Sequence, residues 1–162
     1  MPVTSGETDT GNLTFTIVTE LDATPERLWQ MWADPRLLEQ WWGPPGYPAT
    51  FEEHDLSEGG KASYFMTGPE GEKYPGRWLI LKVEQPYALE IQDGFADDAG
   101  EQDESLPASV FRVTIEVGEG SDSPTRMTIR SQFESIEEME KLIEMGMVEG
   151  MTAAMNQIDS LL

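Results

Sequence analysis

The C-terminal stretch from Ser135 to Leu162 constrains the fold most, because it reads as one amphipathic helix that the rest of the chain has to cover. It opens with a capping box, in which Ser135 can accept from the amide of Glu138 and the Glu138 carboxylate can reach back. No proline interrupts the segment, so we predict a single helix of about 40 Å. Apolar or small residues recur at steps of three and four and define its buried face: Ile136, Met139, Ile143, Met147, Gly150, Met151, Ala154, Ile158 and Leu161.

That face is rich in methionine and glycine. Methionine is flexible and fills irregular space, whereas a glycine inside a helix costs about 1 kcal/mol relative to alanine. Two interpretations stay open: a loosely packed core, or one wall of an apolar ligand cavity. The residues concerned are Met139, Met147, Met151 and Met155, with Gly146 and Gly150 between them.

The chain before this helix predicts a sheet. Thr24-Pro25 and Asp34-Pro35 carry helix-start signals, so two short helices are expected there. Alternation of apolar and polar residues predicts seven strands, at 13–17, 49–56, 61–67, 76–84, 87–92, 110–117 and 125–133. Short connections make the sheet antiparallel. We therefore predict an α+β domain in which a curved, seven-stranded antiparallel sheet wraps around the C-terminal helix.

The domain boundaries follow from composition. Residues 1–11 are polar and rich in Thr, Gly and acids, so they are predicted to be a disordered tail, and 12–162 a single domain. Residues 93–104 contain six acids and no base and are predicted to form a solvated loop.

The net charge excludes some partners. Ten basic against 31 acidic side chains give −21, which disfavours nucleic acids and anionic membrane surfaces. Solubility, for instance in a salty cytoplasm, explains this surface, and a basic protein partner is the alternative. The chain has no cysteine and no signal-like or membrane-spanning apolar run, so we expect a cytoplasmic monomer or homodimer without disulfides.

Signals for catalysis are weak. The single histidine, His54, lies between two acids and is predicted to face the surface, on the opposite side of its strand from Phe51. Neither a nucleophile elbow nor a phosphate-binding loop is present. We therefore predict no catalytic residue, metal site or cofactor. Four arginines are expected to point outward and pair with surface acids: Arg77, Arg112, Arg126 and Arg130.

The aromatic loop Trp41-Trp42-Gly43-Pro44 is the more specific signal. One interpretation is a structural corner, in which indole rings plug one end of the sheet. The other is the rim of an apolar site, where an indole N–H offers a polar contact.

These residues also carry a family resemblance. The order of Asp22-Ala23-Thr24-Pro25-Glu26-Arg27-Leu28-Trp29 and of Asp34-Pro35 before Trp41-Trp42-Gly43-Pro44 resembles the activator-of-Hsp90-ATPase-homologue (AHSA1-like) family, within the START/Bet v 1-like superfamily. Asp55-Leu56-Ser57-Glu58-Gly59-Gly60 and Thr125-Arg126-Met127-Thr128 match as well. The resemblance implies a helix-grip fold and an internal cavity for lipids, polyketides or other apolar molecules. It implies no shared catalytic residue.

We therefore expect non-enzymatic binding of a small hydrophobic or aromatic ligand between the sheet and the C-terminal helix. The candidate cavity residues are Trp42, Tyr64, Met66, Trp78, Phe111, Met127, Ile143, Met147 and Met151. One alternative is a protein-interaction module of the co-chaperone kind. The other is a cyclase- or hydratase-like enzyme, which would need a polar group in the cavity, and Tyr64 and Ser131 are the candidates for it.

Overall fold

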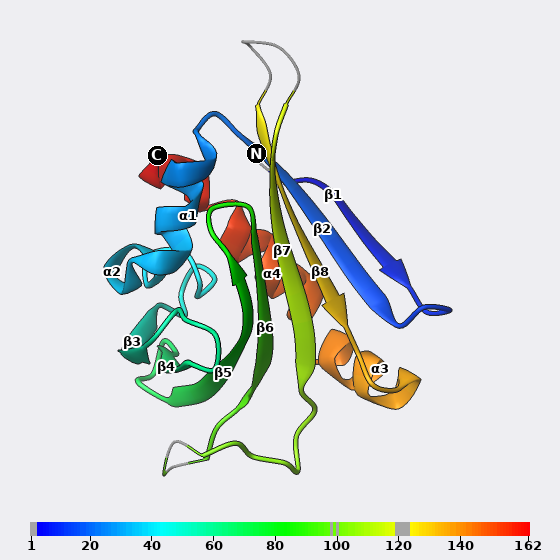
Figure 1. The fold of residues 1–162 in the computed structure, drawn as a ribbon. Helices are drawn as coiled ribbons and strands as arrows, with labels where there is room; N and C mark the ends of the chain where they lie inside the picture. Colours follow the sequence, from blue (N-terminus) through cyan, green and yellow to red (C-terminus); the bar gives the residue numbers. More distant parts are fainter. Residues whose placement is uncertain (1–2, 98, 100, 119–123) are drawn as a thin grey trace.

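The computed structural model describes residues 3–97, 99, 101–118 and 124–162. One antiparallel sheet, in the order β1-β2-β8-β7-β6-β5-β4-β3, curves around the C-terminal helices (Figure 1). The architecture is the predicted α+β helix grip, with eight strands instead of seven. The strands are β1 (Val3–Asp9), β2 (Thr14–Leu21), β3 (Ala49–His54), β4 (Lys61–Thr67), β5 (Lys73–Glu84), β6 (Ala88–Phe95), β7 (Ser109–Val117) and β8 (Thr125–Gln132).

The helices begin where the sequence signals place them. Thr24 caps α1 (Pro25–Ala33) by accepting from the amide of Arg27 at 3.2 Å, and Asp34 caps α2 (Pro35–Leu38) in the same way. Both helices have proline at the first position, where a missing N–H costs nothing. Ser135 caps α3 (Ile136–Glu144) by accepting from the amide of Glu138 at 3.1 Å, as predicted.

The prediction of one uninterrupted C-terminal helix is wrong. The segment divides into α3 (Ile136–Glu144), α4 (Met147–Met155) and a 3₁₀ turn, η1 (Ile158–Leu161). The break lies at Gly146, whose φ of 91° is left-handed and ends the helix in the way glycine commonly does. The apolar spacing continues across the break, which is why periodicity alone does not reveal it.

The prediction of a disordered tail over residues 1–11 is wrong for the residues that the structure describes, and residues 1–2 lie outside them. Val3–Asp9 forms the edge strand β1, which pairs with β2 from Val3↔Thr19 to Asp9↔Thr14. Nearly all of its side chains are exposed, so main-chain hydrogen bonds hold the strand in place. The sequence therefore has no apolar alternation that would predict this strand. The Val3 amide also donates to Oδ1 of Asn156 at 3.1 Å, which ties the strand to the C-terminal segment.

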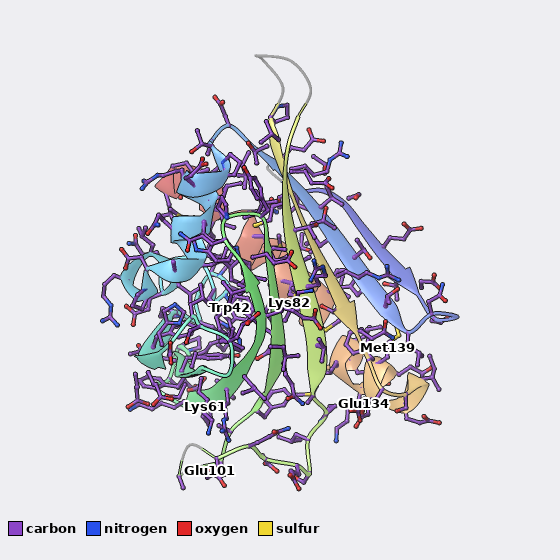
Figure 2. The ribbon with its side chains drawn as sticks, viewed as in Figure 1. Trp42, Lys61, Lys82, Glu101, Glu134 and Met139 are labelled. Atoms are coloured by element: carbon purple, nitrogen blue, oxygen red, sulfur yellow. The ribbon has the colours of Figure 1, made fainter. Side chains whose placement is uncertain are left out.

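Aromatic packing fills one end of the sheet. All five tryptophans are buried, and Trp41 donates its indole N–H to the carbonyl of Met31 at 2.9 Å. The ring of Trp32 meets that of Trp41 edge to face at 4.8 Å, and Trp42 meets Trp78 in the same way at 4.9 Å. Edge-to-face pairs of this kind add to the stabilisation that burial provides. Figure 2 shows Trp42 toward the middle of the molecule.

His54 is not a surface residue, contrary to the prediction. A register shift between Phe51 and Glu53 in β3 adds one residue and turns His54 to the same face as Phe51, whose ring centroid lies 5.8 Å from that of His54. The ring is half-buried, and its Nε2 lies 2.9 Å from the carbonyl oxygen of Trp32. Burial lowers the pKa of His54 below its ordinary value, so the side chain is neutral at physiological pH.

The outer surface carries the predicted ion pairs for three of the four arginines. Arg77 contacts Glu101 at 3.4 Å, on the loop after β6 (Figure 2), Arg112 contacts Glu84 and Glu90, and Arg126 contacts Glu20. Hydrogen bonds from Asn12 are the main cause that lowers the pKa of Asp9, and the charge of Arg130 adds a smaller lowering. Across the part of the chain that is described, no helix combines the length and apolar character needed to cross a membrane.

Candidate ligand cavity

A cavity of about 280 Å³ lies between the sheet, α3, α4 and the aromatic loop. The exposed side chains of Tyr74 and Met145 are part of its wall, so the cavity opens to solvent between β5 and the α3–α4 break. An engineered cavity of about 150 Å³ is known to hold benzene, so this volume suits a ligand of about two rings. Its principal lining residues are Trp41, Trp42, Tyr64, Met66, Gly76, Asp93, Phe95, Phe111, Ser131, Leu142, Met147, Gly150, Met151 and Met155.

The helical wall of the cavity owes its depth to Gly150. A Cβ atom placed at this glycine meets no atom within 4 Å, so the position borders open space instead of a packed neighbour. Met147 and Met151 stand on either side of it in α4 and line the same space. Of the two interpretations of the methionine- and glycine-rich face, the geometry here matches the cavity wall.

The opposite wall contains a buried polar pair. The hydroxyl of Tyr64, in β4, donates to Oδ1 of Asp93, in β6, at 3.1 Å. Between these strands, β5 presents Gly76 opposite Tyr64, and a Cβ there would collide with the phenol ring. Glycine at 76 therefore allows Tyr64 to lie across β5 and reach the carboxylate.

Burial sets the protonation of this pair. Removal from bulk water raises the pKa of Asp93 to about 7, although hydrogen bonding from Tyr64, Trp78 and the Gly94 amide opposes the rise. Burial, together with the charge of Asp93, raises the pKa of Tyr64 well above its ordinary value. Tyr64 thus keeps its proton and donates, while Asp93 exchanges its proton near neutral pH.

Two indoles surround the pair. The N–H of Trp78 acts on Asp93 and that of Trp42 on Tyr64, in each case favouring the charged form. Both indole nitrogens are buried, and neither N–H has a hydrogen-bond partner among the described residues.

The structure places six of the nine predicted site residues on the cavity wall: Trp42, Tyr64, Met66, Phe111, Met147 and Met151. The other three are not there. Trp78 is fully buried beneath the aromatic cluster, and the Met127 sulfur accepts the indole N–H of Trp32 at 3.4 Å in the core. Ile143, on α3 before the break at Gly146, is partly buried and packs against the core.

Asp93 is the charged residue of the cavity wall, and the nine predicted residues do not include it. The predicted strand ends at residue 92, so the prediction places Asp93 in the acidic loop. In the structure β6 continues to Phe95, which places Leu89, Ile91 and Asp93 on one face. Continued alternation was the available signal, but the run of acids that follows Asp93 concealed it.

The site offers little for a metal. Within the described residues, no group of three or more His, Cys, Asp or Glu side chains is arranged to hold an ion. Ser131 lines the cavity from β8 and is otherwise buried, so both polar residues considered for an enzymatic role, Tyr64 and Ser131, do reach the cavity.

Comparison with known proteins agrees with this geometry. Residues 22–162 match the model of the family described as "Activator of Hsp90 ATPase homolog 1-like protein". The chain belongs to the AHSA1 family. The match begins at the Asp22 motif that precedes α1 and covers the aromatic loop, the cavity and the C-terminal helices.

Solved structures share the AHSA1-type fold over nearly the whole chain. Protein Ms6760 from Mycobacterium smegmatis is 45% identical, with 99% of this chain and 97% of that one covered and a TM-score of 0.90. A protein from Arthrobacter aurescens is 50% identical, with 97% and 90% covered and a TM-score of 0.90. A Staphylococcus epidermidis protein, at 26% identity and 98% and 93% coverage, has a TM-score of 0.83. The names of these three proteins state no ligand or activity, and a search of curated proteins found no match.

Proposed function

We propose that this AHSA1-family protein binds a small apolar or aromatic ligand in the cavity between the sheet and α4, without transforming it. The observation that carries the proposal is the open space beside Gly150, enclosed by Met147 and Met151 on one side and by Trp42 and Phe111 on the other. Sites for small molecules are typically concave and mostly apolar, with a few polar groups that fix orientation.

The test is to purify the protein from its own host and examine it by native mass spectrometry. A bound small molecule that denaturation releases, and that 1-methylnaphthalene displaces, is the expected result. A matched control is the Gly150→Leu variant, in which the side chain fills the cavity and the molecule should be absent. Consistent absence of any co-purified molecule, together with no binding of 1-methylnaphthalene, would contradict the proposal.

The second candidate is a protein-interaction module. The specific observation in its favour is the charge of −21, which would attract a basic surface on a partner. Such a complex should weaken steeply with salt, because exposed charge pairs are screened. A pull-down from host lysate, compared at low and high ionic strength, separates the two candidates: recovery of no protein at low ionic strength argues against the module.

The Tyr64–Asp93 pair is the observation that supports the enzymatic alternative. A carboxyl group that exchanges its proton near neutral pH can act as a general acid or base on a molecule in the cavity. If the protein is a cyclase- or hydratase-like enzyme, the co-purified molecule should convert to a product over time, and Asp93→Asn should abolish the conversion while binding persists. An unchanged molecule supports binding alone.

A further inference from the structure

The cavity wall is mostly apolar and carries one acidic group. Asp93 is the carboxylate on its wall, and the side chain keeps part of its surface accessible there. The hydroxyl of Tyr64 donates to it at 3.1 Å, the Gly94 amide and the indole N–H of Trp78 also favour its charged form, and no cationic side chain is among the groups that shift its pKa. The nearby arginine on β5, Arg77, belongs to the outer face and pairs with Glu101.

This arrangement leaves the ionised form of Asp93 without a cationic partner among the described residues. Burial disfavours that form and raises the pKa of the carboxyl group to about 7, and a cation beside it would favour the ionised form. Tyr64 occupies Oδ1 at 3.1 Å, while the carboxylate still faces the cavity. A ligand that brings a cationic donor would complete the pairing, whereas an anionic ligand would be repelled.

Two further features favour a cation. The rings of Trp42, Tyr64 and Phe111 all line the cavity, and aromatic faces attract ammonium groups. The net charge of −21 raises the local concentration of cations around the whole molecule and lowers that of anions.

Resting on the proposed binding function, we propose that the cavity selects small aromatic or aliphatic amines, whose ammonium group pairs with Asp93 while the apolar body lies against Met147, Met151 and Phe111. The polar end and the apolar end of the cavity then recognise the two ends of one amphiphilic cation.

A series of naphthalene probes tests this by titration calorimetry. The four probes are 1-naphthalenemethylamine, 1-naphthalenemethanol, 1-methylnaphthalene and 1-naphthoate, which share one apolar body. A charge-assisted hydrogen bond corresponds to a preference of about 10- to 100-fold for the amine over the alcohol or the hydrocarbon. The naphthoate should bind most weakly.

Two matched variants locate the effect. Asp93→Asn removes the charge at nearly constant shape, so the amine should lose its preference and bind like 1-methylnaphthalene. Glu116→Gln removes an equal charge from the exposed face of β7, so it controls for the overall field and should keep the preference. Thermal melts of both variants check that they fold.

The pH profile of the wild type gives an independent readout that needs no variant. The amine stays protonated between about pH 5.5 and pH 8, so affinity should follow the ionised fraction of Asp93 and fall by about tenfold for each pH unit below 7. Two titratable groups lie near Asp93. Tyr64 stays neutral over this pH range. His54 has a lowered pKa and lies behind Trp78, with 6.3 Å between the centroids of the His54 and Trp78 rings. Ser109 faces Asp93 from β7, and Met147 and Met151 from α4 are uncharged.

The outcomes separate the two proposals. Equal affinity for amine and hydrocarbon, or tightest binding of the naphthoate, overturns the amine proposal and leaves the cavity function standing. Absence of binding by all four probes contradicts both. An amine preference that Asp93→Asn abolishes and Glu116→Gln retains supports the pairing.

Discussion

Filling the space beside Gly150 should remove ligand binding without harming the fold. An alanine at this position gains helix propensity of about 1 kcal/mol over glycine, and its Cβ meets no atom within 4 Å. A leucine keeps most of that gain and extends into the cavity. If the position were packed, the larger side chain would instead cost about 1–3 kcal/mol. The sign of the stability change therefore distinguishes open space from close packing.

The assay pairs thermal melts with calorimetric titration of 1-methylnaphthalene. Since about 1 kcal/mol shifts Tm by roughly 2–4 °C in a domain of this size, Gly150→Leu should leave Tm unchanged or slightly raised and abolish binding. Gly150→Ala should raise Tm by roughly 2–4 °C and retain binding, because it adds helix propensity without filling the cavity.

Gly146→Ala is the matched control on the same segment. Gly146 has a φ of 91°, which disfavours any residue with a Cβ, so this variant should lower stability by roughly 1 kcal/mol while Gly150→Ala raises it. A large drop in Tm for Gly150→Leu, with probe binding unchanged, would show that Gly150 packs against the sheet and would refute the reasoning.

Three further predictions concern the core and the edge of the sheet. The pKa of Asp93 is about 7 in the folded state and its ordinary value is 3.8, so folding takes up a proton between these pH values. The stability that this group contributes should therefore fall by about 2 kcal/mol as pH rises from about 5.5 to 7.5. His54, with its lowered pKa, acts in the opposite direction. Subtracting the pH profile of Asp93→Asn from that of the wild type isolates the first effect, and identical profiles would contradict it. Trp41→Phe leaves the buried Met31 carbonyl without its donor and should cost about 1–3 kcal/mol, measured by urea unfolding; no loss would mean that the bond is dispensable. Removing residues 1–11 exposes the edge of β2, so the truncated chain should fold but self-associate in light scattering, unlike the full chain; a truncated chain that stays monodisperse would refute this.

The seven strands with apolar alternation and the three helix caps could be predicted from the sequence because local chemistry determines them. Ser135, Thr24 and Asp34 each form the expected cap. Strand β1 could not be predicted, since its exposed side chains carry no pattern and only main-chain pairing with β2 holds it.

The cavity was partly predictable for the same reason. Met147 and Met151 sit on a face that periodicity defines, and Gly150 marks the gap. The rest depended on long-range geometry: the bulge that turns His54 inward, and the way Tyr64 crosses Gly76 to meet Asp93 two strands away. No spacing along the chain encodes those contacts.

Methionine methyl groups offer the most direct measurement of the central claim, that a small apolar ligand occupies the cavity beside α4. The chain has nine methionines, and those on the cavity wall are Met66, Met145, Met147, Met151 and Met155, whereas Met31, Met127 and Met139 are buried elsewhere in the core. In a ¹³C-methyl NMR titration with 1-methylnaphthalene, the first set should shift and show contacts to the probe, while the second set stays unmoved. Shifts confined to the second set, or no shifts at saturating probe, would contradict the account.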